Sequence, residues 1–209
     1  MVFVQINRMN FYQPYQPCLA LAQKLFAYSL TSLFLLLACN SSIGQSPPDS
    51  NLVHWSATRK LTVDDFGIKI QNGDASPCFA QYSVGYQVGG FDFLRKNFNQ
   101  KVSNYMIKSA SWIDTTGDVS TLLRYQQTLF DLCEIYTRRF RKALRENRKK
   151  ILTGTDFIEA LNEQIMTDFA NRRLLFEQET NSGLLPDRHR LWEIQIRKEL
   201  DELEEFARK

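Results

Sequence analysis

Histidine is scarce in this sequence, and its scarcity limits the metal chemistry that the chain can support. The two histidines, His54 and His189, lie far apart and outside ligand spacings such as C-x-x-C or H-x-x-x-H. We expect His54, beside Trp55, to be a polar residue at a strand end. His189, between Arg188 and Arg190, is expected to be a solvated helix residue. No glycine-rich phosphate loop, G-x-S-x-G turn or internal repeat occurs in the sequence.

Acidic residues are absent before Asp49, and the same region carries an export signal. Residues 25–38 form an uncharged apolar run after Lys24, of signal-peptide length and too short for a comfortable membrane span. Two processing sites fit: a lipobox ending at Cys39, whose lipidation would tether the protein to a membrane, and cleavage after Gly44, which would release it. A retained signal anchor is the remaining alternative. We predict an exported protein with residues 1–44 as its leader, placed in the periplasm, at the outer membrane surface or outside the cell.

The chain without its leader has almost no net charge. Arg8 and Lys24 are two of the 26 basic residues and both belong to the leader, so its removal leaves 24 basic residues against all 23 acidic ones. This balance gives no reason to expect nucleic acid as a partner, and membrane contact is expected only through lipidation. The remaining length suits one domain, residues 52–209, preceded by a polar, proline-containing tether at residues 45–51.

Cysteine is also scarce, and only Cys78 and Cys133 lie outside the leader. An oxidising compartment would permit a disulfide between them. Alternatively, both are small buried side chains, because Cys133 occupies the apolar face of a predicted helix.

Strand patterns occupy the first half of the domain. Alternating apolar and polar residues from Cys78 to Val88 predict a half-buried antiparallel strand. A further strand is predicted from Val102 to Ile107, leading into residues 109–113, whereas residues 91–99 fit either a strand or a short helix. Residues 67–77 are predicted to be loop, because glycine, proline, asparagine and aspartate are frequent there.

The second half is predicted to be helical. One long helix covers residues 122–145, with Asp118 or Ser120 as its cap; a second begins at Thr155 or Asp156, and a third at Pro186. Gly183 suits a left-handed conformation after the second helix. The expected buried faces comprise Leu122, Leu129, Cys133, Tyr136, Phe140 and Leu144; then Phe157, Ile158, Leu161, Ile165, Phe169 and Leu175; then Trp192, Ile196, Leu200 and Leu203. We predict an α+β domain in which a small antiparallel sheet packs on three helices.

Opposite charges gather on two of these helices. Basic residues cluster from residue 138 to residue 150, and acidic residues occupy outer positions of residues 199–205. A phosphate or membrane-surface contact is one interpretation of the basic cluster. Cations at a helix C-terminus facing an acidic partner helix are the interpretation that we favour.

Two segments resemble one bacterial family of secreted proteins regarded as zinc-dependent proteases. Residues 125–138, Y-Q-Q-T-L-F-D-L-C-E-I-Y-T-R, are similar to the family helix H-E-Q-x-H-F-D-x-x-E-x-Y-A-R. Residues 55–66, W-S-A-T-R-K-L-T-V-D-D-F, are similar to the family's opening signature W-S-x-x-R-K-L-T-W-D-D-F. Physically, Trp55 and Phe66 are expected to be core anchors, because each buries a large aromatic area.

The resemblance also implies where a zinc site would lie. In H-E-x-x-H, two histidines four residues apart hold zinc, and the glutamate activates its water. The corresponding residues here are Tyr125, Gln126 and Leu129, and Ser182 replaces the histidine of a further family element, E-T-x-H-G. None of the four supplies a nitrogen ligand or a general base. The resemblance therefore implies a degenerate former site, with no catalytic residue, no metal ligand and no cofactor.

We accordingly expect a catalytically inactive relative of this family, acting as a binding or structural component of the cell envelope. The four replaced positions are expected to line the former catalytic groove, with a peptide or an envelope protein as the partner. A metal-dependent hydrolase with non-standard ligands is the alternative, and it would recruit Asp131, Glu134, Glu179 and either histidine. A structural lipoprotein whose groove binds nothing is a third hypothesis.

Overall fold

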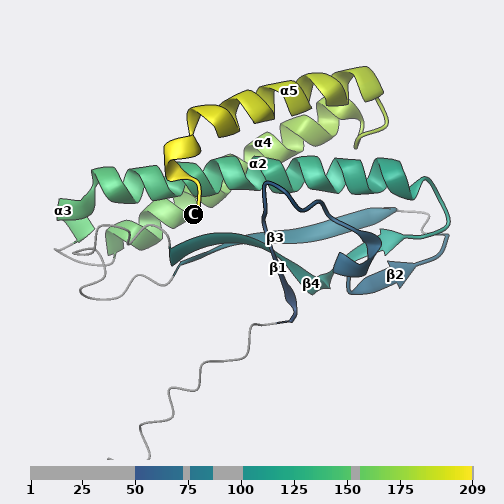
Figure 1. Cartoon of the computed structure of the whole chain (residues 1–209), viewed down its shortest axis with the longest axis horizontal. Coiled ribbons are helices and arrows are strands. Elements are labelled where there is room, and N and C mark those ends of the chain that lie inside the picture. Colours follow the sequence, from purple (N-terminus) through teal and green to yellow (C-terminus); the bar gives the residue numbers. More distant parts are fainter. Residues whose placement is uncertain (1–49, 73–75, 87–100, 152–155, 209) are drawn as a thin grey trace, which may run out of the picture. The chain divides into compact units, whose positions relative to one another are not determined.

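A four-stranded sheet lies beneath a layer of helices in the computed structural model of the chain (Figure 1). The structure describes residues 50–72, 76–86, 101–151 and 156–208. The predicted α+β class is confirmed. The strands come from the first half of the described residues and the helices from the second half.

Strand β4 (Val102–Asp114) organises the sheet, because the other three strands all pair with it. β3 (Cys78–Tyr86) runs antiparallel along the length of β4, with a register shift between Phe79 and Gln81. β1 (Leu52–His54) and β2 (Ile68–Ile70) pair with separate halves of β4. β1 is antiparallel and β2 is parallel, so the sheet is mixed rather than wholly antiparallel.

Two strand predictions need correction. Residues 68–70, predicted as loop, form β2, which is too short to show an alternating pattern and depends on its pairing with β4. The two segments predicted at 102–107 and 109–113 are one continuous strand, β4. The half-buried pattern of residues 78–86 is confirmed, with alternate side chains from Cys78 to Val84 in the core. Val88 and the ambiguous segment 91–99 lie outside the described residues.

Helix α2 (Val119–Glu146) is the central helix of this layer. It contacts β3 and β4 of the sheet and also α4 (Asp156–Thr180) and α5 (Pro186–Glu202) (Figure 1). The predicted cap is confirmed, since the Asp118 carboxylate accepts a hydrogen bond of 3.1 Å from the backbone nitrogen of Thr121. A one-turn helix, α3 (Arg148–Ile151), follows α2, and the short 3₁₀ helices η2 (Val63–Asp65) and η5 (Glu204–Phe206) complete the described elements.

One predicted core position in α4 is wrong. Leu175 is 46% exposed, and its neighbour Phe176 is fully buried instead. The buried residues Ile165, Phe169 and Phe176 follow steps of four and seven, so the next residue on that face is Phe176 and not Leu175. The other two helix faces are essentially as predicted.

Ion pairs join α2 to α5 and η5, as the charge pattern predicts. Arg139 pairs with Glu199 at 3.0 Å, Arg138 with Glu204 at 2.9 Å, and Arg145 with Glu205 at 2.6 Å. These contacts fix the C-terminal residues against the end of α2. Among the described residues, no helix is both long and apolar enough to cross a bilayer.

Candidate functional site

Three of the four positions of the degenerate former site, Tyr125, Gln126 and Leu129, make core contacts. Tyr125 stacks on Phe176 of α4, with ring centroids 5.4 Å apart and planes 16° apart. Gln126 faces the sheet, where its amide oxygen accepts a 2.9 Å hydrogen bond from the Tyr82 hydroxyl and its amide nitrogen lies 3.2 Å from the Cys78 sulfur. Leu129 is fully buried.

The turn after α4 closes over Tyr125. Asn181, Ser182 and Gly183 all have positive φ, which confirms the left-handed conformation predicted for Gly183. A Cβ atom on Gly183 would lie 3.0 Å from the Cβ and Cδ2 atoms of Tyr125, so only glycine permits this close approach. Ser182 is exposed beside it. The turn that carries Ser182 thus lies next to Tyr125.

The prediction of an open groove at these four positions is wrong. Gln126 and Leu129 are 0% exposed and Tyr125 is 6% exposed, so three of the four residues cannot line an open groove. Large side chains replace the expected ligands and fill the space between α2, α4 and the sheet. These residues therefore act in packing in this structure.

The predicted position of His189 is also wrong. Its side chain is 1% exposed and packs against Phe176, and its Nε2 lies 2.8 Å from the Thr128 hydroxyl. His189 lies one turn before Trp192, on the buried α5 face that also carries Ile196. The prediction of a solvated residue relied on the flanking arginines instead of on this helical spacing. Burial lowers the pKa of His189, although the nearby Glu193 carboxylate partly opposes this effect. His54 is exposed in the edge strand β1, as predicted.

Both cysteines in the described residues are free thiols buried in the core. Burial raises the pKa of Cys78 and of Cys133, so both stay protonated and unreactive at neutral pH. The structure agrees with the alternative of two small buried side chains rather than a disulfide between Cys78 and Cys133.

The three carboxylates that the alternative, a metal-dependent hydrolase, would use as ligands each bind other side chains. Asp131 accepts hydrogen bonds from Trp55 and Gln127, and Glu179 accepts one of 2.8 Å from the Trp192 indole. Glu134 pairs with two arginines inside the core. Over the described ranges, histidine, cysteine, aspartate and glutamate form no group of three or more that could hold a metal ion.

The two family-like segments contact each other directly. We call residues 55–66 the N-terminal segment. The Trp55 indole nitrogen donates a 2.8 Å hydrogen bond to Asp131, and the backbone nitrogen of Leu61 donates a 2.9 Å bond to the Gln127 side chain. The Arg138 guanidinium lies 5.4 Å from the centre of the Trp55 ring. The shared residues of the two segments therefore hold the N-terminal segment on α2.

The N-terminal segment also stabilises its own turn. The Asp65 carboxylate accepts hydrogen bonds from the Thr62 backbone nitrogen and hydroxyl, at 2.8 and 3.1 Å, and pairs with Arg59. Phe66 is fully buried, as predicted, and Gly67 follows it against the backbone of Lys108, where a Cβ atom would collide. This turn returns the chain to the sheet.

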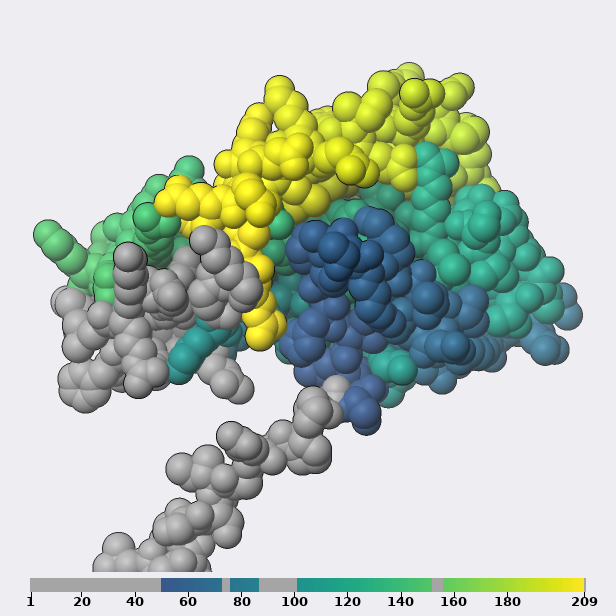
Figure 2. All heavy atoms as spheres, in the orientation of Figure 1, coloured from purple at the N-terminus to yellow at the C-terminus, as the bar shows by residue number. Residues whose placement is uncertain are grey.

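A cavity of about 480 Å³ lies between the N-terminal segment, α2 and α5, and we call it the Asp131 cavity. Figure 2 shows the N-terminal segment in blue beside the C-terminal residues in yellow. Apolar side chains of Leu61, Leu123 and Ile196 line this cavity together with charged residues of both signs. Its size and mixed lining are those of a ligand-binding cleft.

Asp131 is the unusual group of this cavity. Its Oδ1 accepts both hydrogen bonds, from Trp55 and from Gln127, whereas Oδ2 faces the Lys60 ammonium at 3.8 Å. Burial raises the pKa of Asp131, although Trp55, Lys60 and Gln127 partly offset this effect. A partly buried carboxyl with a raised pKa in a cleft is typical of a functional site.

A second cavity, of about 390 Å³, adjoins the first, because Trp55, Ala57, Arg138 and Glu204 line both. We call it the Asn104 cavity. Asn104 of β4 and the buried pair Glu134 and Arg141 of α2 form part of its wall. Sequence patterns did not indicate these cavities, because their walls combine strand, segment and helix residues that are far apart in the chain.

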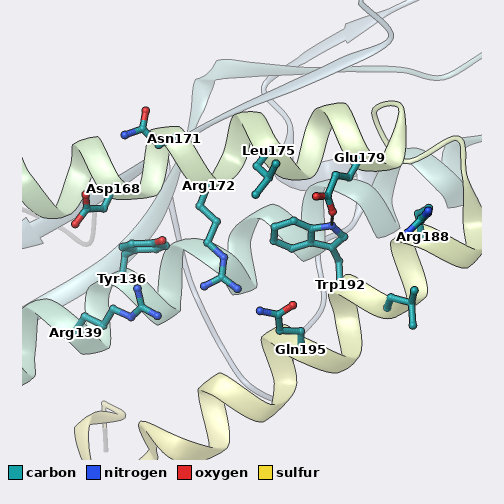
Figure 3. Close-up of a pocket in the computed structure, with 11 residues that line it drawn as sticks. Tyr136, Arg139, Asp168, Asn171, Arg172, Leu175, Glu179, Arg188, Trp192 and Gln195 are labelled. Carbon is teal, nitrogen blue, oxygen red and sulfur yellow. Dashed lines mark hydrogen bonds between the residues drawn. The ribbon is translucent and has the colours of Figure 1, made fainter.

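A third cavity, of about 570 Å³, lies between α4 and α5 (Figure 3). Figure 3 shows Trp192 extending from α5 toward α4 and Arg172 extending from α4 toward α5. Arg172 binds Glu199 through both guanidinium nitrogens, and Arg139 pairs with the same carboxylate. These hydrogen bonds lower the pKa of Glu199. Because its main charged groups already bind each other, we consider this cavity a helix-packing feature.

Comparisons with protein-family models, curated proteins and solved structures found no match to this chain.

Proposed function

We propose that the protein is an exported, non-catalytic relative of the secreted zinc-protease-like family and binds a peptide in the Asp131 cavity. The non-catalytic part rests on Tyr125, Gln126, Leu129 and Ser182, which replace the expected ligands and base. Burial of the first three supports it, because a core position leaves no room for metal, water and substrate together.

Export rests on the sequence. The apolar run at residues 25–38, followed by Cys39 and Gly44 as alternative processing sites, is typical of a secreted protein or a lipoprotein. In either case the protein acts in the cell envelope or outside the cell. Lipidation at Cys39 would keep it on a membrane.

The single observation that carries peptide binding is the composition of the Asp131 cavity. Leu61, Leu123, Ile196 and Leu200 offer apolar contacts, and charges of both signs surround them. A peptide presents the same combination, with apolar side chains between polar backbone groups. Asp131 Oδ2 is available there to a peptide N–H or a basic side chain, since the two hydrogen bonds described above use Oδ1.

The test is an array of defined nonapeptides probed with the purified protein. We expect a subset of the peptides to bind, and Leu123→Asp to weaken their binding at least tenfold, because it places a charge on the apolar wall of the Asp131 cavity. The matched control is Leu191→Asp, which makes the same change in the α4–α5 cavity. Thermal unfolding of both variants checks that each is folded.

Two results would contradict the proposal. Absence of binding to every peptide in the array is one. Equal weakening by Leu123→Asp and Leu191→Asp is the other, because it would place binding outside the Asp131 cavity.

A further inference from the structure

Asn104 carries a buried acceptor that the surrounding protein does not use. Its side chain is 3% exposed, on β4, in the wall of the Asn104 cavity. The amide nitrogen donates a 3.2 Å hydrogen bond to the Phe130 carbonyl, which fixes the orientation of the group. The amide oxygen is buried and has no donor among the described residues. A buried acceptor without a donor is costly, so this oxygen calls for a partner that enters the cavity.

Glu134 supplies a second acceptor in the same wall. Its Oε1 accepts from Arg141 Nη1 at 2.8 Å and from Arg138 Nε at 3.2 Å. Both of these bonds use Oε1, so Oε2 is the second acceptor oxygen of this wall. The cavity therefore offers two acceptor oxygens, from Asn104 and from Glu134.

The charges and acceptors of the wall exclude an ionised partner. Three guanidinium groups, of Arg138, Arg141 and Arg208, line the cavity with two carboxylates, of Glu134 and Glu204, so an additional cation would be repelled. A simple anion such as a carboxylate offers only acceptors, and so has no donor for the Asn104 and Glu134 oxygens. The remaining class of partner is a neutral group that donates hydrogen bonds.

A primary carboxamide meets this description. Its planar NH₂ group has two donors for the two acceptor oxygens, and its own oxygen requires one donor. That donor is present at the edge of the cavity, where the Ser56 and Thr58 hydroxyls lie 3.2 Å apart. Only one of the two hydroxyls donates in their mutual hydrogen bond, so the other is free to donate to the carboxamide oxygen.

We propose that the Asn104 cavity binds the side-chain carboxamide of a glutamine or asparagine in a peptide that occupies the Asp131 cavity. The peptide part rests on the proposed function. Trp55 and Arg138 line both cavities, so one ligand can continue from the first into the second. The carboxamide site defines which residue the peptide must contain.

The first experiment uses acetamide as the probe, added to the full ¹⁵N-labelled protein and followed by NMR. We expect acetamide to shift the Asn104 side-chain and Trp55 indole signals. Acetate and methylammonium, which have a similar size and carry a charge, are expected to bind at least tenfold more weakly. Absence of a shift with acetamide, or equal shifts with all three probes, would overturn the proposal.

Variants test whether the NMR shifts caused by acetamide arise from binding in the Asn104 cavity. Asn104→Leu is expected to abolish it, whereas Asn162→Leu is the matched control, because Asn162 of α4 also has a buried amide oxygen without a partner among the described residues. The double variant Ser56→Ala/Thr58→Val removes both hydroxyls at the cavity edge and keeps the test valid if Asn104→Leu fails to fold. It should weaken acetamide binding several-fold. A response that survives both changes would exclude this cavity as the site.

The second experiment compares two peptides from the array that differ only by glutamine or glutamate at one position. We expect about tenfold tighter binding of the glutamine peptide, a preference that Asn104→Leu removes. Peptides that bind without this preference would overturn the carboxamide site and leave peptide binding intact. Acetamide binding without any peptide binding would support the carboxamide site and contradict the proposed function.

Discussion

The Trp55 indole nitrogen donates a hydrogen bond of 2.8 Å to the Asp131 carboxylate, across 76 residues of sequence. This bond joins the two segments on which the family resemblance rests. The bond lies where the Asp131 and Asn104 cavities adjoin, since Trp55 lines both. Residues of the two segments that carry the family resemblance therefore stabilise the fold and line a cleft.

The Trp55–Asp131 bond should be measurable in stability. Trp55→Phe keeps an aromatic ring and removes the indole donor, so we expect a loss of about 1.5–3 kcal/mol in the free energy of unfolding, the range for bonds to charged groups. Urea unfolding gives this value. In the Asp131→Leu background the same change should cost much less, because the acceptor is already gone. An equal cost in both backgrounds would show that ring packing, and not this bond, is responsible.

Asp131 should make stability depend on pH. Burial raises the pKa of Asp131 in the folded protein above its ordinary value of 3.8. The folded state therefore binds this proton more tightly than the unfolded state. The resulting stabilisation is fully present below pH 3.8 and is lost as the pH rises through the folded pKa. Asp131→Asn keeps an oxygen for Trp55 and Gln127 and removes the titration. We expect the stability of this variant relative to the natural protein to increase from pH 3.5 to neutral pH, measured by urea unfolding. A constant difference would contradict the raised pKa.

His189 should give a pH dependence of the opposite sign. Burial lowers the pKa of His189 in the folded protein, and the unfolded chain titrates near 6.5. Below pH 6.5 the unfolded state binds more protons, so stability is lost as the pH falls toward the folded pKa. His189→Gln removes this term. We expect a smaller drop in the denaturation midpoint between pH 7.5 and pH 5 in the variant. The same drop in both proteins would mean that His189 is not the group that titrates.

Glu134 should be far more important for stability than an exposed acid that also pairs with an arginine of α2. Glu134→Gln leaves Arg138 and Arg141 buried with less compensation, and breaking such a pair costs about 3–5 kcal/mol. The matched control is Glu205→Gln, whose pair with Arg145 is exposed and contributes less than about 1 kcal/mol. Chemical unfolding of both variants makes the comparison. Similar small losses would contradict a buried ion pair at Glu134.

Periodicity in the sequence was sufficient to predict the helices and β3, because each of them buries one regular face. The face of α4 was misassigned at Leu175, since two neighbouring apolar residues, Leu175 and Phe176, compete for one inward position. Strand β2 was missed because three residues are too few for a pattern.

The buried polar residues could not be predicted in the same way. Burial of Gln126 depends on hydrogen bonds from Tyr82, which is 44 residues away, and no local pattern reveals them. His189 was misplaced because arginines flank it, although its helix position faces Thr128. The unpartnered oxygen of Asn104 follows from the tertiary packing of β4 against α2 and has no sequence signal.

Restoring the four family residues tests whether Tyr125 and its neighbours mark a former zinc site. We expect the variant with the four substitutions Tyr125→His, Gln126→Glu, Leu129→His and Ser182→His to bind about one zinc equivalent, measured by elemental mass spectrometry after removal of unbound ion. The natural protein should retain less than about a tenth. The physical basis is that residues 125 and 129 are one helical turn apart, and the turn carrying Ser182 lies against Tyr125. The matched control keeps Ser182 and should bind zinc more weakly, because it lacks the third ligand. A folded four-residue variant that binds no zinc would contradict the degenerate-site interpretation, whereas one equivalent in the natural protein would favour the alternative, a metal-dependent hydrolase.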